Sequence, residues 1–534
     1  MTASLMDIRR FLETRVERHL DKPFLFFEDE VYSYQAFDRR INKFANALLE
    51  LGIRKGDRVC LYLPNIPDFL FSWFALSKIG AVMVPLNVAF KNEEAGYIIN
   101  HCEAAGVIID ADHQKMAGAF RADCRRLKWV LGTGSNILEK GVIPFSDILA
   151  DMGEELKGFD IKNHDIAQIA YTSGTTGFPK GAIHTHENFT LTGEAFTICA
   201  ALKPHDRLMI VMPLFHANAQ FYSTMGALAA EAAVVLVRNF SAGNFWNQAV
   251  KYQVTEFNFV GAIGRILSNR PPDEFRPEHR IRTAYGALVN ADVYEIFTRR
   301  FGIKNVIDGY GLTEVPRVCQ NPIGGTIKMN SIGLPAKHPD PKQPFSQIKI
   351  VGEDGREAGP GAIGEITVKS PVMMKGYHKD AQATQQAFKD GWFYTGDMGY
   401  RDEDGYIFFV DRKKDIIRKK GENLSPAELE AAINTHPKVS ESAVIAVPSE
   451  VGEDEILACI VPALNARLNA EEIIDWCKPR LAGFKLPRYV KFMQSLPKTA
   501  TARIAKYRLK ENPAIVETAV DMKKYLKKEL NKVS

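Results

Sequence analysis

The sequence is poor in the features that mark disulfide-stapled, zinc-binding or nucleic-acid-binding proteins. It has 7 cysteines in 534 residues, and these are widely spaced and form no Cys-x-x-Cys pair. This pattern argues against a disulfide framework and a zinc ribbon, and it indicates a reducing, cytoplasmic setting. Basic side chains outnumber acidic ones by only 68 to 64, a net charge of +4. That balance is too small to indicate nucleic acid or an anionic membrane as a partner.

Long apolar runs are also missing. No stretch reaches the roughly 18 residues that a membrane span needs, and the aromatic segment at residues 69–79 is interrupted by Lys78. The first 23 residues lack the apolar core of a secretory signal, and they mix basic with acidic side chains, unlike a transit peptide. We therefore expect a cytoplasmic protein without a membrane span.

What the sequence does contain is an ordinary globular composition with alternating strand and helix patterns. Hydrophobic residues make up 46% and charged residues 25%, and the length corresponds to three or four domains of about 150 residues. The spacing of apolar residues predicts helices over 7–20, 35–51 and 69–79, and the apolar runs predict strands over 59–65, 81–87, 106–110 and 128–134. A second series, with strands over 208–213, 233–237 and 256–261, follows residues 170–181.

These patterns predict the α/β fold class, with a large N-terminal domain of two α/β layers over residues 1–150 and 165–330. Asp-Gly and Pro-Gly turns between short strands predict a small β-barrel-like unit over residues 331–410. The composition changes at residue 412, and a small α+β domain is expected after it. The predicted domains are therefore residues 1–411 and 412–534.

The most distinctive local pattern is the glycine- and hydroxyl-rich segment Thr172–Gly181. Its glycines allow the backbone to approach an anion closely, and its hydroxyls and successive N–H groups suit phosphate oxygens. Lys180 adds a positive charge, although a generic surface loop is the alternative interpretation. Gly181 follows Lys180 where a Walker loop needs Ser or Thr, so a P-loop kinase or ATPase is disfavoured.

Further motifs occur in a fixed order along the chain. They are YTSGTTGFPKGA (171–182), PLFH (213–216), YGLTE (310–314), YTGD (394–397), DRKKD (411–415) and GEN (421–423). Together they resemble the acyl-adenylate-forming superfamily of acyl-CoA synthetases, peptide-synthetase adenylation domains and firefly-type luciferases. The resemblance covers nearly the whole chain and is strongest to carboxylic acid–CoA ligases of the crotonobetaine/carnitine type.

The resemblance implies an enzyme that uses ATP, Mg2+ and coenzyme A, and it leaves open a homodimer. A carboxylate would attack the α-phosphate of ATP to give acyl-AMP and pyrophosphate, and the thiol of CoA would then displace AMP. The acid is expected to be short- or medium-chain, cyclic or aromatic. Two alternatives remain open: a stand-alone adenylation enzyme that loads a carrier protein, and a nucleotide- or acyl-AMP-binding protein with impaired adenylation.

The resemblance also implies roles for individual residues. Glu314 would hold Mg2+, Thr313 would bond the α-phosphate, and the ring of His216 would border the acid's carboxylate. Asp397 would accept hydrogen bonds from the ribose hydroxyls, and Arg412 would reach ribose or phosphate. The rest of the implied nucleotide and CoA site is Thr172, Ser173, Gly174, Thr175, Thr176, Gly177, Lys180, Gly286, Ala287, Leu288, Asp308, Gly309, Tyr310, Gly311, Phe409 and Gly421.

The C-terminal part is implied to be mobile, rotating about a hinge at Lys414 between the two half-reactions. There the sequence departs from the superfamily, because Arg503 stands where a lysine usually contacts the carboxylate and the α-phosphate. Arginine offers a planar fork and lysine a compact charge, so the two are not equivalent. Arg503 is either a tolerated replacement or a change that slows adenylation, unless Lys506 takes over the role.

The acid pocket is implied to lie beside the same motifs. It would be lined by small, amide and apolar residues and one cation, namely Ala217, Asn218, Gln220, Val260, Gly261, Leu312 and Arg317. Such pockets are mostly apolar with a few placed polar groups. Arg317 either pairs with a second carboxylate of the substrate or forms a surface salt bridge.

Overall fold

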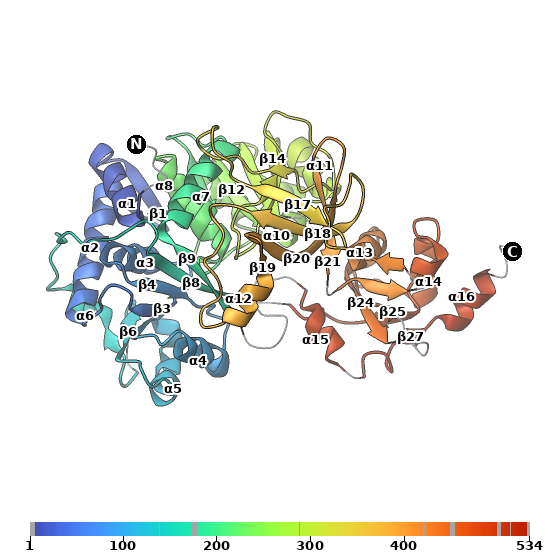
Figure 1. Ribbon diagram of the computed structural model, residues 1–534, viewed down its shortest axis with the longest axis horizontal. Coiled ribbons are helices and arrows are strands. Elements are labelled where there is room, and N and C mark those ends of the chain that lie inside the picture. The colour runs from blue at the N-terminus through green and yellow to red at the C-terminus, as the bar shows by residue number, and fades with distance from the viewer. Residues whose placement is uncertain are drawn as a thin grey trace. The chain divides into compact units, whose positions relative to one another are not determined.

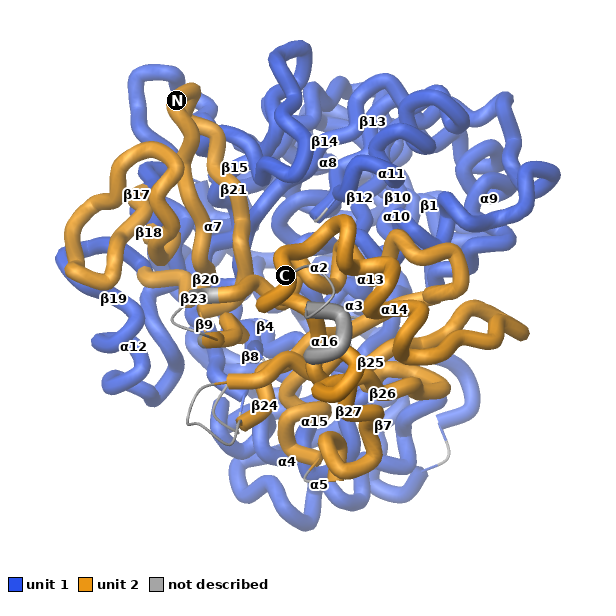
Figure 2. The backbone as a smooth tube through the Cα atoms, turned by 90° about the vertical axis from the view of Figure 1, so that its right-hand side faces the viewer, with its two compact units in different colours: residues 1–348, 368–393 blue, residues 349–367, 394–534 orange. Residues whose placement is uncertain are grey.

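The computed structural model of the protein (Figure 1) describes residues 6–530 except 138, 173–178, 288, 414, 420–421, 449–453, 499–503 and 513. Contacts along the chain divide it into two compact units, coloured separately in Figure 2. The first comprises residues 1–348 and 368–393, and the second comprises residues 349–367 and 394–534. The domain boundary expected at residue 411 stays a prediction.

Two mixed sheets form the frame of the first unit. The larger has the order β16-β15-β14-β13-β12-β10-β11-β1-β2, and its strands from β14 to β1 run parallel. In that order the strands are Leu334–Pro335, Cys319–Gln320, Asn305–Tyr310, Thr283–Ala287, Glu256–Val260, Arg207–Ile210, Ala233–Leu236, Pro23–Phe27 and Glu30–Ser33.

The smaller sheet has the order β7-β6-β5-β3-β4-β8-β9, and only its β8–β9 pair is antiparallel. In that order the strands are Ile143–Pro144, Trp129–Thr133, Gly106–Asp110, Arg58–Tyr62, Val82–Pro85, Ile166–Thr172 and Lys180–Thr185. The predicted α/β class is therefore confirmed. Assigning the layers to residues 1–150 and 165–330 was wrong in detail, because β1 and β2 join the later sheet and β8 and β9 join the earlier one.

Helices alternate with strands along the first unit, and the helical spacing of apolar residues marks the side that each helix buries. The apolar positions of α2 repeat every three or four residues and are buried, and the Ser33 side chain caps its first turn by accepting from the Ala36 N–H. The helices are α1 (Ile8–Arg18), α2 (Tyr34–Glu50), α3 (Pro67–Ile79), α4 (Asn92–His101), α5 (Ala117–Asp123), α6 (Phe145–Leu149), α7 (His186–Cys199), α8 (Met225–Ala229), α9 (Phe245–Lys251), α10 (Gly261–Ser268), α11 (Ala291–Glu295) and α12 (Ala381–Ala387).

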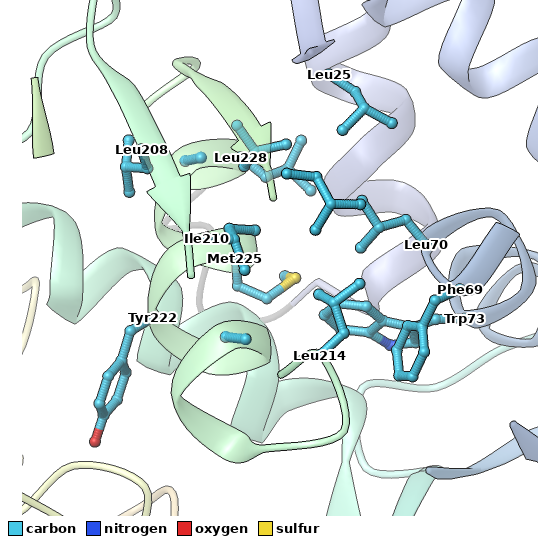
Figure 3. Close-up of a cluster of buried hydrophobic side chains, with 14 of the residues drawn as sticks. Leu25, Phe69, Leu70, Trp73, Leu208, Ile210, Leu214, Tyr222, Met225 and Leu228 are labelled. Carbon is cyan, nitrogen blue, oxygen red and sulfur yellow. The ribbon is translucent and has the colours of Figure 1, made fainter. Parts of the chain in front are cut away.

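Helix α3 is buried on almost every side, which explains its uninterrupted apolar sequence. Figure 3 shows Phe69, Leu70 and Trp73 of α3 with Leu25 and Leu214 in one apolar cluster. Burial of this kind contributes about 1.5–3 kcal/mol for each large apolar side chain. No helix among the residues described here has both the length and the apolar character needed to cross a membrane.

The rest of the structure is built largely of β-structure and short helices. One sheet pairs β17-β18-β20-β19, with β21 added to β20, and these strands are Gln347–Val351, Gly364–Lys369, Trp392–Arg401, Phe388–Lys389 and Ile407–Arg412. A hairpin of β22 (Ile417–Lys419) and β23 (Glu422–Leu424) follows.

A further sheet, β24-β25-β26-β27, packs with helices toward the end of the chain. Its strands are Val439–Pro448, Asp454–Pro462, Tyr489–Phe492 and Val520–Asp521, and the helices are α13 (Pro426–Asn434), α14 (Ala470–Cys477), α15 (Lys506–Lys510) and α16 (Lys523–Leu530). The expected β-rich unit and the α+β unit after it are thus both present.

Candidate functional site

The carboxyl ends of four neighbouring parallel strands bring several predicted site residues to one edge of the larger sheet. Strands β10, β12, β13 and β14 are parallel, so their carboxyl ends point the same way. Half-buried residues end or follow them, including Val260, Gly261, Ala287 and Tyr310. In open α/β sheets this edge is the usual place for ligands. Residues predicted for the nucleotide and residues predicted for the acid therefore lie at the same edge.

A tight turn after β14 carries Thr313 and Glu314. The Leu312 N–H bonds the Val315 carbonyl at 2.9 Å, and the Val318 N–H bonds the Tyr310 carbonyl at 3.0 Å. A side-chain carbon on Gly311 would lie 2.3 Å from the Pro316 carbonyl oxygen. Only glycine fits there, so the turn holds Glu314 in a defined place.

Two residues outside the predicted set fix this turn. The Tyr377 hydroxyl donates to Glu314 Oε1 at 3.0 Å, and His184 Nε2 bonds the Thr313 carbonyl at 2.8 Å. Because a carbonyl only accepts, His184 carries its proton on Nε2. Burial lowers the pKa of His184 to about 4, so this imidazole is neutral at pH 7.

Tyr377 also links Glu314 to the predicted phosphate loop. Residues 375–378 run beside β9, with the Lys375 N–H bonding the Ile183 carbonyl at 2.9 Å and the His378 N–H bonding the Gly181 carbonyl at 2.7 Å. The Lys180 Nζ atom lies 5.4 Å from the centre of the Tyr377 ring. A cation, a phenol and a carboxylate therefore lie close together in the first unit.

The predicted phosphate loop connects two paired strand ends. Thr172 and Lys180 are partners in the antiparallel register of β8 and β9, so the segment between them begins and ends at a fixed point. Ser173, Gly174, Thr175, Thr176 and Gly177 lie outside the described residues.

The predicted adenine walls lie on adjacent strands. Gly286 of β13 is the register partner of Asp308 of β14, and Asp308 is buried. A side-chain carbon on Gly309 would lie 1.9 Å from the Tyr285 hydroxyl oxygen, so this position also admits only glycine. Leu288 lies outside the described residues.

His216 follows β10 but does not belong to it. Strand β10 ends at Ile210, and a turn with the His216 N–H bonded to the Pro213 carbonyl at 3.0 Å separates them. A π-helical stretch, Asn218–Thr224, follows at once. Such stretches are frequent at functional sites, and this one places His216 at the beginning of a helix.

The predicted acid-pocket residues divide into two groups. Ala217, Asn218, Val260, Gly261 and Leu312 are half-buried.

Gln220 and Arg317 are instead fully enclosed. Gln220 donates to the Leu214 carbonyl at 2.7 Å and accepts from Gln168 at 2.5 Å. Its amide oxygen and nitrogen are therefore both hydrogen-bonded within the protein. This geometry does not support the prediction that Gln220 lines the acid pocket. The surface salt bridge considered for Arg317 is also wrong, because only 1% of that residue is exposed.

In the second unit, Asp397 and Arg412 are register partners on β20 and β21. Arg412 Nε lies 2.7 Å from Asp397 Oδ1, and Asp397 is 1% exposed whereas the Arg412 side chain is 37% exposed. The Thr395 hydroxyl accepts from the Asp397 N–H at 3.1 Å and fixes the backbone. Phe409, on β21, is half-buried. The Asp397 carboxylate, which can accept hydrogen bonds, is thus held in place by the Arg412 guanidinium.

The remaining predictions for the second unit concern the hinge, the passage for the thiol, and the position where an arginine replaces the usual lysine. Lys414, Gly421 and Arg503 lie outside the described residues. Lys506 is held by an ion pair of 2.8 Å with Glu430, and burial raises the pKa of Glu430. This pairing opposes the alternative that Lys506 takes the role predicted for position 503.

No group of three or more His, Cys, Asp or Glu side chains suited to a metal ion occurs in the part of the chain that the structure describes. Mg2+ is commonly held by one or two carboxylates together with phosphates of the substrate. The single half-buried carboxylate of Glu314 fits that mode and does not fit a cage made by protein alone.

Comparison with known proteins agrees with this geometry. The family model described as AMP-binding enzyme matches residues 12–378, and that of the AMP-binding enzyme C-terminal domain matches residues 428–503. The chain belongs to the AMP-binding enzyme family. Within it, this protein is an enzyme of the AMP-forming acid–CoA ligase group, which confirms the resemblance carried by the ordered motifs.

Individual members of the family cover nearly the whole chain. The crotonobetaine/carnitine–CoA ligase of Proteus mirabilis (strain HI4320) is 34% identical over 525 residues, spanning 94% of this chain and 98% of its own. The anthranilate CoA ligase AuaEII, solved with anthranoyl-AMP, has a TM-score of 0.87 at 26% identity, covering 96% of this chain and 98% of its own. ATP-bound MatB from Rhodopseudomonas palustris has a TM-score of 0.85 at 27% identity, covering 95% and 99%.

Proposed function

We propose that this family member joins a carboxylic acid to coenzyme A in two steps, with ATP converted to AMP and pyrophosphate. The observation that carries the proposal is the turn after β14, where Glu314 is held by the Tyr377 hydroxyl beside Lys180. A fixed carboxylate beside a fixed cation suits a triphosphate with its metal ion. The relatives that are named as CoA ligases, and the one solved with an acyl-AMP, support the same chemistry.

In the first step a carboxylate oxygen of the acid bonds the α-phosphorus of ATP, and pyrophosphate leaves with the electron pair of the broken P–O bond. Two anions must meet, so fixed positive charge lowers the barrier. Lys180 and the N–H groups of the loop after Thr172 would hold the phosphates, and Thr313 would bond the α-phosphate. Mg2+ bound to Glu314 would neutralise charge that develops on the phosphate oxygens.

In the second step the CoA sulfur bonds the acyl carbon, and AMP leaves with the electron pair of the anhydride C–O bond. His216 at the beginning of its helix would border the reacting carboxyl group. Gly421, by resemblance, would leave the thiol free passage. The experiment that tests the proposal is a panel of carboxylic acids assayed separately for pyrophosphate and for CoA thioester. Acid-dependent release of both supports it, and ATP consumption independent of every acid would contradict it.

Tyr377→Phe is expected to lower the kcat of pyrophosphate release about tenfold. The change removes the one hydroxyl that bonds Glu314 Oε1 at 3.0 Å, and hydrogen bonds to charged groups are worth about 1.5–3 kcal/mol. Steady-state pyrophosphate assays at saturating ATP measure the effect, and the exposed Tyr507→Phe is the matched control. Equal activity of Tyr377→Phe and wild type would show that the bond does not position Glu314.

Asp397→Asn is expected to raise the KM for ATP by about tenfold while changing kcat less. The amide keeps the shape but accepts only on its oxygen, and it weakens the pairing with Arg412, which lies 2.7 Å away. The exposed Asp404→Asn, in the turn between β20 and β21, is the control. A KM for ATP that stays at the wild-type value in Asp397→Asn would remove Asp397 from the proposed nucleotide site.

A further inference from the structure

Arg317 is a fully buried cation whose hydrogen bonds are incomplete. It lies between β14 and β15, is 1% exposed, and its carbonyl accepts from the Ser346 hydroxyl at 3.1 Å. Its Nη2 donates to Gln320 Oε1. Its Nε and Nη1 are buried and have no hydrogen-bond partner in the described part of the chain. Beyond Gln320, the guanidinium contacts only the Cys199 sulfur, which is a weak acceptor, so its donors are poorly matched within the described residues.

The surroundings of Arg317 do not compensate its charge. The ionisable groups that face it are the thiols of Cys199 and Cys319 and the phenols of Tyr222 and Tyr285. Burial raises the pKa of each of these four groups, so all are neutral at pH 7. In the described part of the chain, the charges that act most strongly on Arg317 include no aspartate or glutamate. A buried, unpaired guanidinium is costly, because desolvation is not offset by an opposite charge.

Arg317 is linked through Tyr222 to Gly311, the residue before Leu312 of the predicted acid pocket. Tyr222 faces Arg317, and a side-chain carbon on Gly311 would lie 2.6 Å from the Tyr222 hydroxyl oxygen. Figure 3 shows Tyr222 pointing away from the apolar cluster of Leu214 and Met225, with its hydroxyl outermost. Tyr222 lies in the π-helical stretch Asn218–Thr224, which begins two residues after His216.

We infer that the acid activated by this enzyme carries a second carboxylate, which accepts hydrogen bonds from Arg317. The inference rests on the proposed function and adds the class of substrate, a dicarboxylic acid whose reacting end lies at His216. Nε and Nη1 supply the donors, and the added negative charge compensates the buried cation. A quaternary ammonium acid such as carnitine is excluded by the same charge, which separates this enzyme from its carnitine-activating relatives.

The test compares matched acids on wild type and on Arg317→Met, which removes the charge while keeping a long side chain. Glutarate and pentanoate have the same carbon number, as do adipate and hexanoate, and carnitine completes the panel. For wild type we expect kcat/KM for pyrophosphate release to be at least about 100-fold higher with the diacid of each pair, because a site built around a polar contact rejects the analogue that lacks it. Arg317→Met should lose that preference, because its kcat/KM should fall far more with the diacids than with the monoacids.

Each outcome decides the inference. A wild-type preference for monoacids or for carnitine would overturn it, and so would an equal loss with diacids and monoacids in Arg317→Met, which marks a structural role. Should Arg317→Met fail to fold, the wild-type panel and the thermal protection of wild type by each acid still decide it. Absence of pyrophosphate with every acid would instead contradict the proposed function itself, so the two failures are distinguishable.

Discussion

Glu314→Gln is expected to lower acid-dependent pyrophosphate release by about 10²- to 10³-fold, the range seen when one preorganised charge-stabilising contact is lost. Glutamine keeps the size and the bond from Tyr377, which is 3.0 Å in the native protein, but it removes the negative charge expected to hold Mg2+. The apparent affinity for Mg2+ should fall together with kcat. Pyrophosphate release measured across a Mg2+ titration reports both quantities.

Glu50→Gln is the matched control for this experiment, because Glu50 is exposed at the last residue of α2. It should behave as wild type. If Glu314→Gln turns over at the wild-type rate, or if its Mg2+ dependence is unchanged, the turn after β14 does not hold the metal and the proposed site fails.

Arg503→Lys is expected to raise the rate of pyrophosphate release by roughly 10- to 1,000-fold, about 1.4 kcal/mol for each factor of ten. A compact ammonium replaces a planar fork at a position where the resemblance implies contact with both reacting anions. Thioester formation from preformed acyl-AMP should change much less, because the α-phosphate bond is already made. Separate assays of the two half-reactions measure this split.

Two controls accompany this variant. Arg508→Lys makes the same exchange at an exposed position of α15 and should have no effect. Lys506→Met should mainly lower stability, because it leaves Glu430, now paired at 2.8 Å, buried without its cation. An unchanged rate in Arg503→Lys together with a loss of adenylation in Lys506→Met would transfer the role to Lys506.

Much of the fold followed from apolar periodicity and turn residues, but the strand order did not. The strand at residues 106–110 and the helix at 69–79 were predicted close to their observed bounds, because continuous apolar runs mark buried elements. The partners of β1 could not be predicted in this way. Pro23–Phe27 pairs with Ala233–Leu236 about two hundred residues later, and such a pairing leaves no local pattern in either segment.

The site was predictable where a residue lies in a recognisable motif and unpredictable where another element supports it. Glu314 was selected from YGLTE, whereas Tyr377 stands in an ordinary GYHKD segment and gains its role only by lying beside β9. Gln220 looked like a pocket amide, yet its oxygen accepts a hydrogen bond from Gln168 of β8. Whether Arg317 was exposed or buried also depended on packing from α7 and the helix after His216, which no single segment encodes.

The most direct test of the central claim is to follow the carboxylate oxygen of the acid. An acid that the panel shows to be active is labelled with oxygen-18 in its carboxyl group and incubated with the enzyme, ATP, Mg2+ and CoA. If the carboxylate attacks the α-phosphorus and AMP later leaves the acyl carbon, one labelled oxygen must appear in AMP and none in the pyrophosphate. Label in inorganic phosphate with ADP as the nucleotide product, or unlabelled AMP, would contradict the account.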